Sequence, residues 1–155
     1  MLFGSIEKLQ ERVEHLVTLR ELQDESLGKR TLDPSAGCFQ TFIPLRFHNE
    51  NNRLERITEP TAADTLRTIA VPRLMLDNFS HVKSYWVMLG MSLAQLSLSY
   101  GASDIDGTVR EERIYHMAGA RTPQELTRTE LIQMIRNAGR IPVERDTHYL
   151  VAAEA

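Results

Sequence analysis

TFIPLRFHNENN, residues 41–52, is the stretch that decides the fold, because an apolar run ends there abruptly in a polar cluster. Residues 39–47 have the length and the aromatic and β-branched content of a buried strand. A strand that ends in polar loop residues is how α/β folds present side chains to a ligand, although a merely solvated loop has the same pattern. The sequence therefore predicts a buried strand with candidate ligand-contacting residues directly after it.

Strand-like and helix-like segments alternate outward from this stretch. Besides 39–47, we expect strands over 1–6, 82–89 and 103–106. A helix is predicted over 7–27, with Ser5 as its N-cap and Gly28 at its end. A second helix begins after Thr61 and is expected to kink or divide near Val71, because Pro72 cannot donate a backbone hydrogen bond. A third, short helix is predicted over 91–100.

The remainder of the chain contains residue patterns that are typical of helix ends. Three T-x-x-E capping boxes begin at Thr108, Thr122 and Thr127, and the last helix is predicted to stop at Gly139. We therefore expect residues 108–155 to form a helical extension packed on an α/β domain that spans residues 1–107.

Four strands separated by helices indicate parallel βαβ units. A complete (β/α)₈ barrel needs roughly 200 residues or more, which leaves two interpretations: a small open α/β sheet, or the C-terminal half of a (β/α) barrel. The start of the chain within a strand favours the half-barrel. Its two open edges would invite pairing with a missing N-terminal half or with a second copy of the chain.

Composition excludes several classes of partner. The formal charge of −3 and the absence of a basic run give no general attraction for nucleic acid or an anionic membrane. The most apolar region, 82–100, is interrupted by polar residues, and residues 1–5 lack a signal-peptide pattern. The single cysteine, Cys38, excludes an internal disulfide. We expect a cytoplasmic protein.

Six segments together resemble the C-terminal part of the aminofutalosine synthase family, the radical S-adenosylmethionine (SAM) enzymes of the futalosine route to menaquinone. They are MLFG at 1–4, ERVEHLVTLRELQDE at 11–25, FQTFIPLRFHNEN at 39–51, RLMLDNFSHVKSYWVMLG at 73–90, DIDGTVREERIYHMAG at 104–119 and AGRIPVERDT at 138–147. The dehypoxanthine futalosine cyclases are similar in outline, but IPLRFH, MLDNF, YWVMLG and DGTVREE fit the synthase better. The chain departs from the synthase pattern at Ser5, Asn49 and Pro72, and 27–36 looks like an insertion.

The resemblance implies a radical-SAM-type (β/α) barrel, of which this chain is the C-terminal half. It also implies SAM and a [4Fe–4S] cluster held by a CxxxCxxC loop, and the addition of a SAM-derived adenosyl radical to 3-[(1-carboxyvinyl)oxy]benzoate. Three thiolates are needed for such a cluster, and Cys38 alone cannot supply them. We therefore expect a substrate-side half that works with an N-terminal half. The alternatives are a non-catalytic truncated fragment and a relative of the cyclase.

Strand ends face the active site of a barrel, and this places the candidate site residues. His48 is the catalytic candidate; the substrate-binding candidates are Arg46, Tyr85 and Trp86; the cofactor-binding candidates are Asp104, Asp106 and Thr108.

Each of these residues also has a structural interpretation. Arg46 suits a bidentate carboxylate contact but could equally form a structural ion pair, and His48 could simply be solvated. Asp104 and Asp106 could contact ribose hydroxyls, but residues 106–108 could equally form a turn with a helix cap. Trp86 has the character of a core residue. The histidines lack metal-binding spacing, so we predict no metal ligands in this chain.

Overall fold

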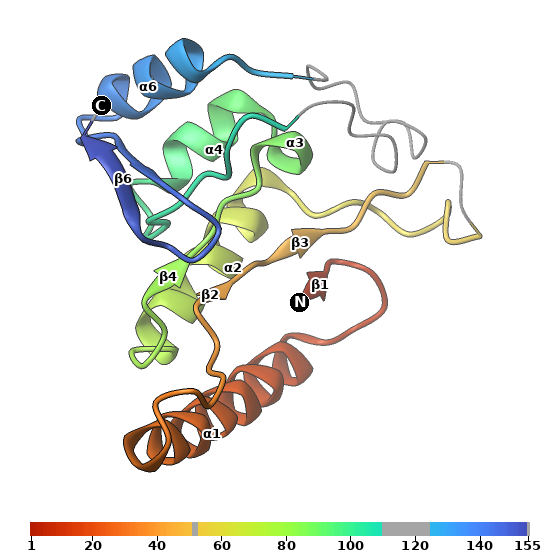
Figure 1. The fold of residues 1–155 in the computed structure, drawn as a ribbon. Coiled ribbons are helices and arrows are strands. Elements are labelled where there is room, and N and C mark those ends of the chain that lie inside the picture. The colour runs from red at the N-terminus through yellow and green to blue at the C-terminus, as the bar shows by residue number, and fades with distance from the viewer. Residues whose placement is uncertain (51–52, 110–124, 155) are drawn as a thin grey trace.

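The computed structural model describes residues 1–50, 53–109 and 125–154 of the chain. It is a small mixed α/β structure in which helix α1 lies at one end, helix α6 lies at the other, and short strands run between them (Figure 1). In chain order the elements are β1 (Leu2–Phe3), α1 (Leu9–Leu32), β2 (Thr41–Phe42), β3 (Leu45–Arg46), α2 (Ala62–Met75), β4 (His81–Val82), α3 (Trp86–Leu89), α4 (Met91–Ser97), α6 (Arg128–Asn137), β5 (Val143–Arg145) and β6 (Val151–Glu154).

The strands of the first two thirds of the chain pair in parallel, as predicted. β1 pairs with β3, and β2 pairs with β4. A single parallel bridge joins Lys83 to Asp104. Strands β2 and β3 follow each other within residues 41–46, so they occupy one position in the arrangement. The spatial order is therefore β1 first, then β2 and β3 together, then β4, and last the segment at Asp104. The carboxyl ends of these strands therefore lie along one edge of the arrangement.

Two of the predicted strands differ from the observed structure. The predicted strand 39–47 is two short strands separated by Ile43 and Pro44, since a proline has no amide to donate to the ladder. The predicted strand 82–89 is wrong beyond Lys83, because residues 86–89 form α3 and all four are buried. An apolar run that is buried on every side carries no periodicity to separate strand from helix.

The helix boundaries also differ from those predicted. The first helix begins at Leu9 after Lys8 and continues to Leu32, so the predictions of Ser5 as N-cap and of an end at Gly28 are wrong. Gly28 is accommodated because a glycine inside a helix costs only about 1 kcal/mol. Thr61 caps α2 as predicted, accepting from the Asp64 amide at 3.1 Å. That helix runs unbroken through Pro72, whose carbonyl accepts from the C-cap residue one turn later.

The C-terminal region is partly strand, and the prediction of an entirely helical extension is wrong. The capping box at Thr127 and Glu130 is confirmed, with the Thr127 amide donating to the Glu130 carboxylate at 2.8 Å. Strands β5 and β6, however, form an antiparallel hairpin. Its turn is organised by the Asp146 carboxylate, which accepts from two nearby backbone amides. The two other predicted capping boxes include residues outside the described part of the chain.

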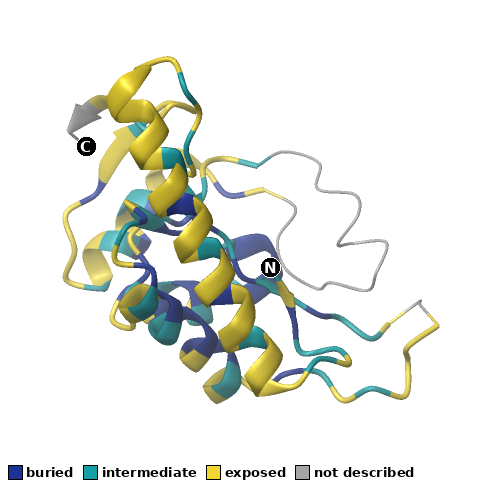
Figure 2. Cartoon of the chain, turned by 90° about the horizontal axis from the view of Figure 1, so that it is seen from below, coloured by how far each residue is buried: buried dark blue, intermediate teal, exposed yellow. Residues whose placement is uncertain are grey.

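The core lies where the sheet meets α2, α3 and α4, with Leu16 added from α1 and Leu131 and Met134 added from α6. Helix α1 buries only Leu16 and Gln23, so most of its length is exposed (Figure 2). The buried Gln23 amide bridges α1 to the approach to β2, because it both donates to and accepts from the Phe39 backbone. None of the described helices is long and apolar enough to cross a membrane. The buried core comprises Leu16, Phe42, Ile69, Leu76, Phe79, Val82, Trp86, Val87, Leu89, Ala94, Leu98, Ala102, Ile105, Leu126, Leu131 and Met134.

Candidate functional site

Arg46 and His48, predicted to meet one ligand together, converge on the carboxylate of Glu59. Arg46 Nη2 lies 3.1 Å from Glu59 Oε2 and also donates to the Pro60 carbonyl at 2.7 Å. His48 Nδ1 lies 3.1 Å from Glu59 Oε1. The Asn49 amide donates to the same Oε1 at 3.2 Å. Glu59, in the loop before α2, therefore contacts both Arg46 and His48 at the end of β3.

The electrostatics of this cluster keep Glu59 ionised. Burial by itself would raise the pKa of the Glu59 carboxyl, but the Asn49 amide, the His48 ring and the Arg46 guanidinium together lower that pKa below its ordinary value. The guanidinium is thus already paired with a carboxylate from its own chain, which supports the structural alternative for Arg46. Glu59 also fixes the orientation of the His48 ring. A substrate contact of either residue stays a prediction.

Sequence reasoning missed Glu59. It stands thirteen positions after Arg46 in a polar loop, and no local spacing links the two. The only available signal was an acidic residue directly before Pro60 and the Thr61 cap, and an acidic residue there is equally typical of an ordinary helix entry.

A second polar cluster surrounds Asp104, on the segment that lies beside β4 at the end of the parallel arrangement. Arg145 reaches Asp104 Oδ2 with Nη2 at 2.6 Å and with Nε at 2.7 Å. Lys83 Nζ lies 3.2 Å from Asp106 Oδ1. The Asp106 amide donates to Asp104 Oδ1 at 2.9 Å. Both carboxylates predicted to contact a cofactor are therefore held by cations of the same chain.

Tyr149 packs within this second cluster. Its ring stacks on His81 with centroids 4.6 Å apart, and the Arg145 guanidinium carbon lies 3.9 Å from its centroid. Burial lowers the pKa of His81; the Asp104 carboxylate opposes this effect and the Arg145 cation adds to it. Arg145 and Tyr149 of the hairpin therefore pack against Asp104 and His81, which belong to the last two parallel segments.

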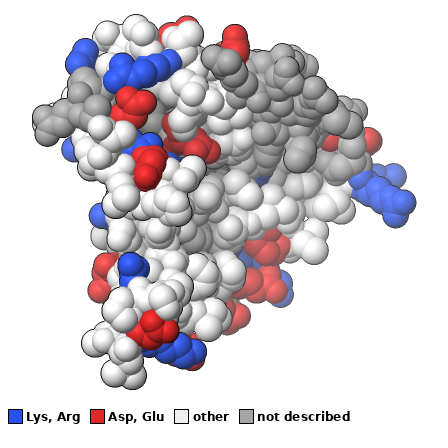
Figure 3. Space-filling view, in the orientation of Figure 1, with Lys and Arg blue, Asp and Glu red and all other residues white. Residues whose placement is uncertain are grey.

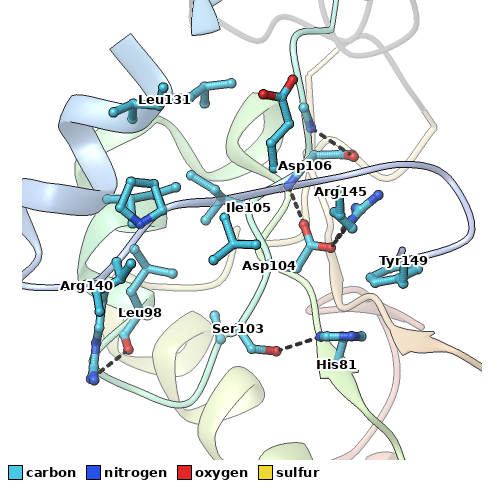
Figure 4. Close-up of a pocket in the computed structure, with 18 of the residues that line it drawn as sticks. His81, Leu98, Ser103, Asp104, Ile105, Asp106, Leu131, Arg140, Arg145 and Tyr149 are labelled. Atoms are coloured by element: carbon cyan, nitrogen blue, oxygen red, sulfur yellow. Dashed lines mark hydrogen bonds and ion pairs between the residues drawn. The ribbon is translucent and has the colours of Figure 1, made fainter. Parts of the chain in front are cut away.

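A cleft of about 960 Å³ opens beside this cluster (Figure 4). Its lining includes Asp104, Asp106 and Thr108, so the structure brings the three predicted cofactor-binding residues together. Asp104 and Arg145 point toward each other across the cleft wall (Figure 4). The rest of the lining is mainly apolar and comes from the segment 98–105, helix α6 and the hairpin. Because Arg73, His81, Arg128, Arg140 and Glu144 also line it, a cleft of this size is suited to a ligand with both apolar and charged parts.

Tyr85 and Trp86 follow β4, as a strand-end site requires, but they differ in exposure. Tyr85 is half-buried and is the N-cap residue of α3. The Trp86 side chain has no exposed surface, and its Nε1 donates to the Gly107 carbonyl at 3.1 Å. Trp86 thereby fastens the loop after Asp106 to the core. Direct contact of either residue with a substrate stays a prediction.

The described residues do not fit an iron–sulfur cluster. No group of three or more His, Cys, Asp or Glu among them could hold a metal ion. The thiol sulfur of Cys38 accepts a hydrogen bond from Arg30 Nη1 at 2.8 Å. Because three thiolates are needed and the whole sequence contains one cysteine, the cluster of a radical SAM enzyme cannot be held by this chain alone.

The surface charge is mixed. On the face shown in Figure 3, acidic and basic side chains are scattered among uncharged residues, and the described part of that face carries no continuous basic band. The expectation that the chain binds no nucleic acid stays a prediction.

Comparison with known proteins shows which family the chain belongs to. A family model described as the CofH/MqnC C-terminal region matches residues 36–154. The chain belongs to this family. It is 51% identical over 153 residues to an aminodeoxyfutalosine synthase of Thermus thermophilus, covering 96% of this chain and 38% of the relative. It is 40% identical to a cyclic dehypoxanthine futalosine synthase of Streptomyces coelicolor, covering 96% of this chain and 34% of the relative.

A third relative extends the family beyond futalosine chemistry. The chain is 37% identical to a 5-amino-6-(D-ribitylamino)uracil–L-tyrosine 4-hydroxyphenyl transferase of Methanoculleus marisnigri, covering 96% of this chain and 39% of that protein. The chain thus spans less than two fifths of the length of these three curated relatives. It corresponds to a C-terminal part of such proteins.

Proposed function

We propose that this chain supplies the substrate side of an aminodeoxyfutalosine synthase, in which a SAM-derived adenosyl radical is joined to 3-[(1-carboxyvinyl)oxy]benzoate. The observation that carries the proposal is the 51% identity to the Thermus synthase along 96% of the chain. Identity to the Streptomyces cyclic dehypoxanthine futalosine synthase over the same share of the chain is 40%, which favours the synthase reaction over the cyclase reaction.

In this proposal the chain is the C-terminal half of a radical-SAM-type (β/α) barrel. A half-barrel requires neighbouring strands that run parallel. The parallel pairs β1 with β3 and β2 with β4, and the bridge from Lys83 to Asp104, support this proposal. The cluster and SAM cleavage belong to an N-terminal portion that carries the cysteine loop. This chain's own residues then bind and orient the substrate.

Two groups of residues are proposed to do this. The Arg46 and His48 pair, held by Glu59, lies at the end of β3, where it would face the benzoate carboxylate. Asp104, Asp106 and Thr108 would face the nucleoside part. Because Glu59 already neutralises Arg46, the substrate carboxylate would share or replace an existing ion pair. Substrate binding should therefore depend on Glu59 as well as on Arg46.

A chimera tests this proposal. The N-terminal portion of the Thermus synthase is joined to this chain in place of its own C-terminal part, and the protein is reconstituted anaerobically with iron and sulfide. We expect formation of aminodeoxyfutalosine from SAM and 3-[(1-carboxyvinyl)oxy]benzoate, and no turnover of dehypoxanthine futalosine. A folded chimera that cleaves SAM but converts neither compound would support a non-catalytic fragment instead. Turnover of dehypoxanthine futalosine alone would support the cyclase.

A further inference from the structure

The two carboxylates beside the cleft differ in what their oxygen atoms already bind. Both oxygens of Asp104 are occupied, because Arg145 contacts Oδ2 at 2.6 and 2.7 Å and the Asp106 amide donates to Oδ1 at 2.9 Å. Only 10% of the Asp104 side chain is exposed. To contact a ligand, Asp104 would have to leave a nearly buried ion pair, and breaking such a pair is strongly destabilising.

Asp106 has one carboxylate oxygen that its own chain does not use. Lys83 Nζ and the Gly107 amide both contact Oδ1, at 3.2 and 3.3 Å. In the part of the chain that the structure describes, Oδ2 accepts no hydrogen bond. The Asp106 side chain is 28% exposed, and the residue lines the cleft. Of the two carboxylates, Asp106 is therefore the one that can accept from a donor in the cleft.

The backbone of Asp106 is held in an uncommon conformation. Its φ is 39°, in the left-handed region that residues other than glycine seldom adopt. Such a conformation persists only where the surroundings hold it. Trp86 Nε1 fastens the next residue by donating to the Gly107 carbonyl at 3.1 Å. The Asp104 carboxylate acts on Asp106 itself, since it accepts the Asp106 amide, and the place of that carboxylate depends on Arg145.

The C-terminal hairpin fixes Arg145 in turn. The guanidinium carbon lies 3.9 Å from the centroid of the Tyr149 ring, and that ring stacks on His81 of β4. Asp106, Asp104, Arg145 and Tyr149 therefore follow one another along one wall of the cleft (Figure 4). A change at Arg145 would reach Asp106 through the Asp104 carboxylate.

We propose that Asp106 contacts the ligand, by accepting a hydrogen bond from a ligand hydroxyl at Oδ2, and that Asp104 and Arg145 are positioning residues that hold Asp106 for this contact. The inference rests on the proposed function, in which this group of residues faces the nucleoside part, and it assigns the members of the group different roles. A site built to bind a hydroxyl rejects an analogue that lacks it, because the acceptor is then left without a partner. Preference for the hydroxylated nucleoside thus depends on Arg145, which does not touch the ligand.

Kinetics of the chimera test the contact. Asp106→Gly removes the carboxylate, and glycine adopts the left-handed backbone without strain. Arg145→Met removes the guanidinium. Each should raise KM for SAM about tenfold and change kcat less than about threefold, because the lost hydrogen bond is to a charged group and serves binding. With the 2′-deoxy or 3′-deoxy analogue of SAM that lacks the contacted hydroxyl, neither substitution should change KM.

Two further variants separate positioning from a general structural role. The double variant of Asp106→Gly with Arg145→Met should have the KM of Asp106→Gly alone, because Arg145 acts through Asp106. Arg145→Lys keeps a cation for Asp104 and should recover part of the affinity for SAM that Arg145→Met loses.

Amide hydrogen exchange of the chain alone, followed by NMR, gives a readout that does not depend on activity. Arg145→Met should speed exchange of the Asp106 amide about tenfold, because the Asp104 carboxylate that accepts it is released. The Ser84 amide donates to the Asp104 main-chain carbonyl and should change little. Arg20→Met is the control, since Arg20 forms an exposed ion pair on α1 and should affect neither amide.

Four results would overturn the inference. They are an unchanged KM in Asp106→Gly, increases in KM that persist with both deoxy analogues, a further increase when Arg145→Met is added to Asp106→Gly, and equal or absent acceleration of the Asp106 and Ser84 amides in Arg145→Met. A chimera that forms no product would count against the proposed function, and the exchange measurement would still decide whether Arg145 positions Asp106.

Discussion

Arg145 Nη2 lies 2.6 Å from Asp104 Oδ2, and this contact joins the C-terminal hairpin to the last segment of the parallel sheet. The Asp104 side chain is only 10% exposed, so its charge depends on this partner. Arg145 also lies over the Tyr149 ring, which stacks on His81. One guanidinium therefore organises the hairpin and one wall of the cleft.

Arg145→Ala should lower the free energy of unfolding by about 2–4 kcal/mol, because it leaves a nearly buried carboxylate unpaired. Urea denaturation measures this loss. Arg128→Ala is the matched control, since Arg128 pairs with Glu144 at an exposed position and should contribute less than about 1 kcal/mol. Equal effects of the two substitutions would contradict the role given to the Asp104 contact. In the double variant with Asp104→Asn, we expect a smaller loss than the sum of the single losses.

Glu7 should make stability depend on pH in the acid range. Burial alone would raise the pKa of Glu7, but the amides of Gly4 and Ser5 and the Ser5 hydroxyl outweigh it and lower the pKa to about 2. Because the folded-state pKa lies below the ordinary 4.5, the stabilisation is complete above pH 4.5 and is lost as pH falls toward 2.

Glu7→Gln should remove about 2–3 kcal/mol of stability at pH 7 and flatten the dependence between pH 5 and 2. Chemical denaturation across this range is the measurement. Glu21→Gln, at an exposed position, is the control and should leave the profile unchanged. A Glu7→Gln profile parallel to that of the unmodified protein would show that the carboxylate does not have the assigned pKa.

Glu59→Gln should destabilise the β3 end, because Arg46 and His48 lose their shared charged partner. We expect a loss of about 1–3 kcal/mol near neutral pH. Since the pKa of Glu59 is lowered in the folded protein, the stabilisation is present above the ordinary carboxyl pKa and declines as pH falls through the lowered value. Thermal unfolding compared with the exposed control Glu55→Gln measures the effect. Indistinguishable melting of the two variants would contradict the anchoring role of Glu59.

Two glycine substitutions should act in opposite directions. Gly4 has φ +85°, and a Cβ there would overlap Cγ of Pro60, so Gly4→Ala should cost at least about 2 kcal/mol. Gly28 lies inside α1, and a Cβ added there would have nothing within 4 Å, so Gly28→Ala should stabilise by about 0.5–1 kcal/mol. Calorimetric melting of both variants checks the pair. Stabilisation by Gly4→Ala would show that the close approach to Pro60 is not rigid.

Sequence reasoning predicted that the strands pair in parallel and that Thr61 and Thr127 cap helices, because apolar runs and capping motifs are local signals. It placed Asp104, Asp106 and Thr108 on what proved to be one cleft. It could not find Glu59 or Arg145, which reach their partners across thirteen and forty-one positions of sequence. It also read α3 as strand, because a segment buried on every side loses its periodicity.

The most direct measurement of the central claim is the anaerobic turnover assay of the chain alone beside the chimera that carries the Thermus N-terminal portion. The proposal predicts that the chain alone binds no four-iron cluster and forms no deoxyadenosine, while the chimera converts SAM and 3-[(1-carboxyvinyl)oxy]benzoate to aminodeoxyfutalosine. Stoichiometric cluster binding by the chain alone, or a folded, cluster-loaded chimera that forms no product, would contradict it.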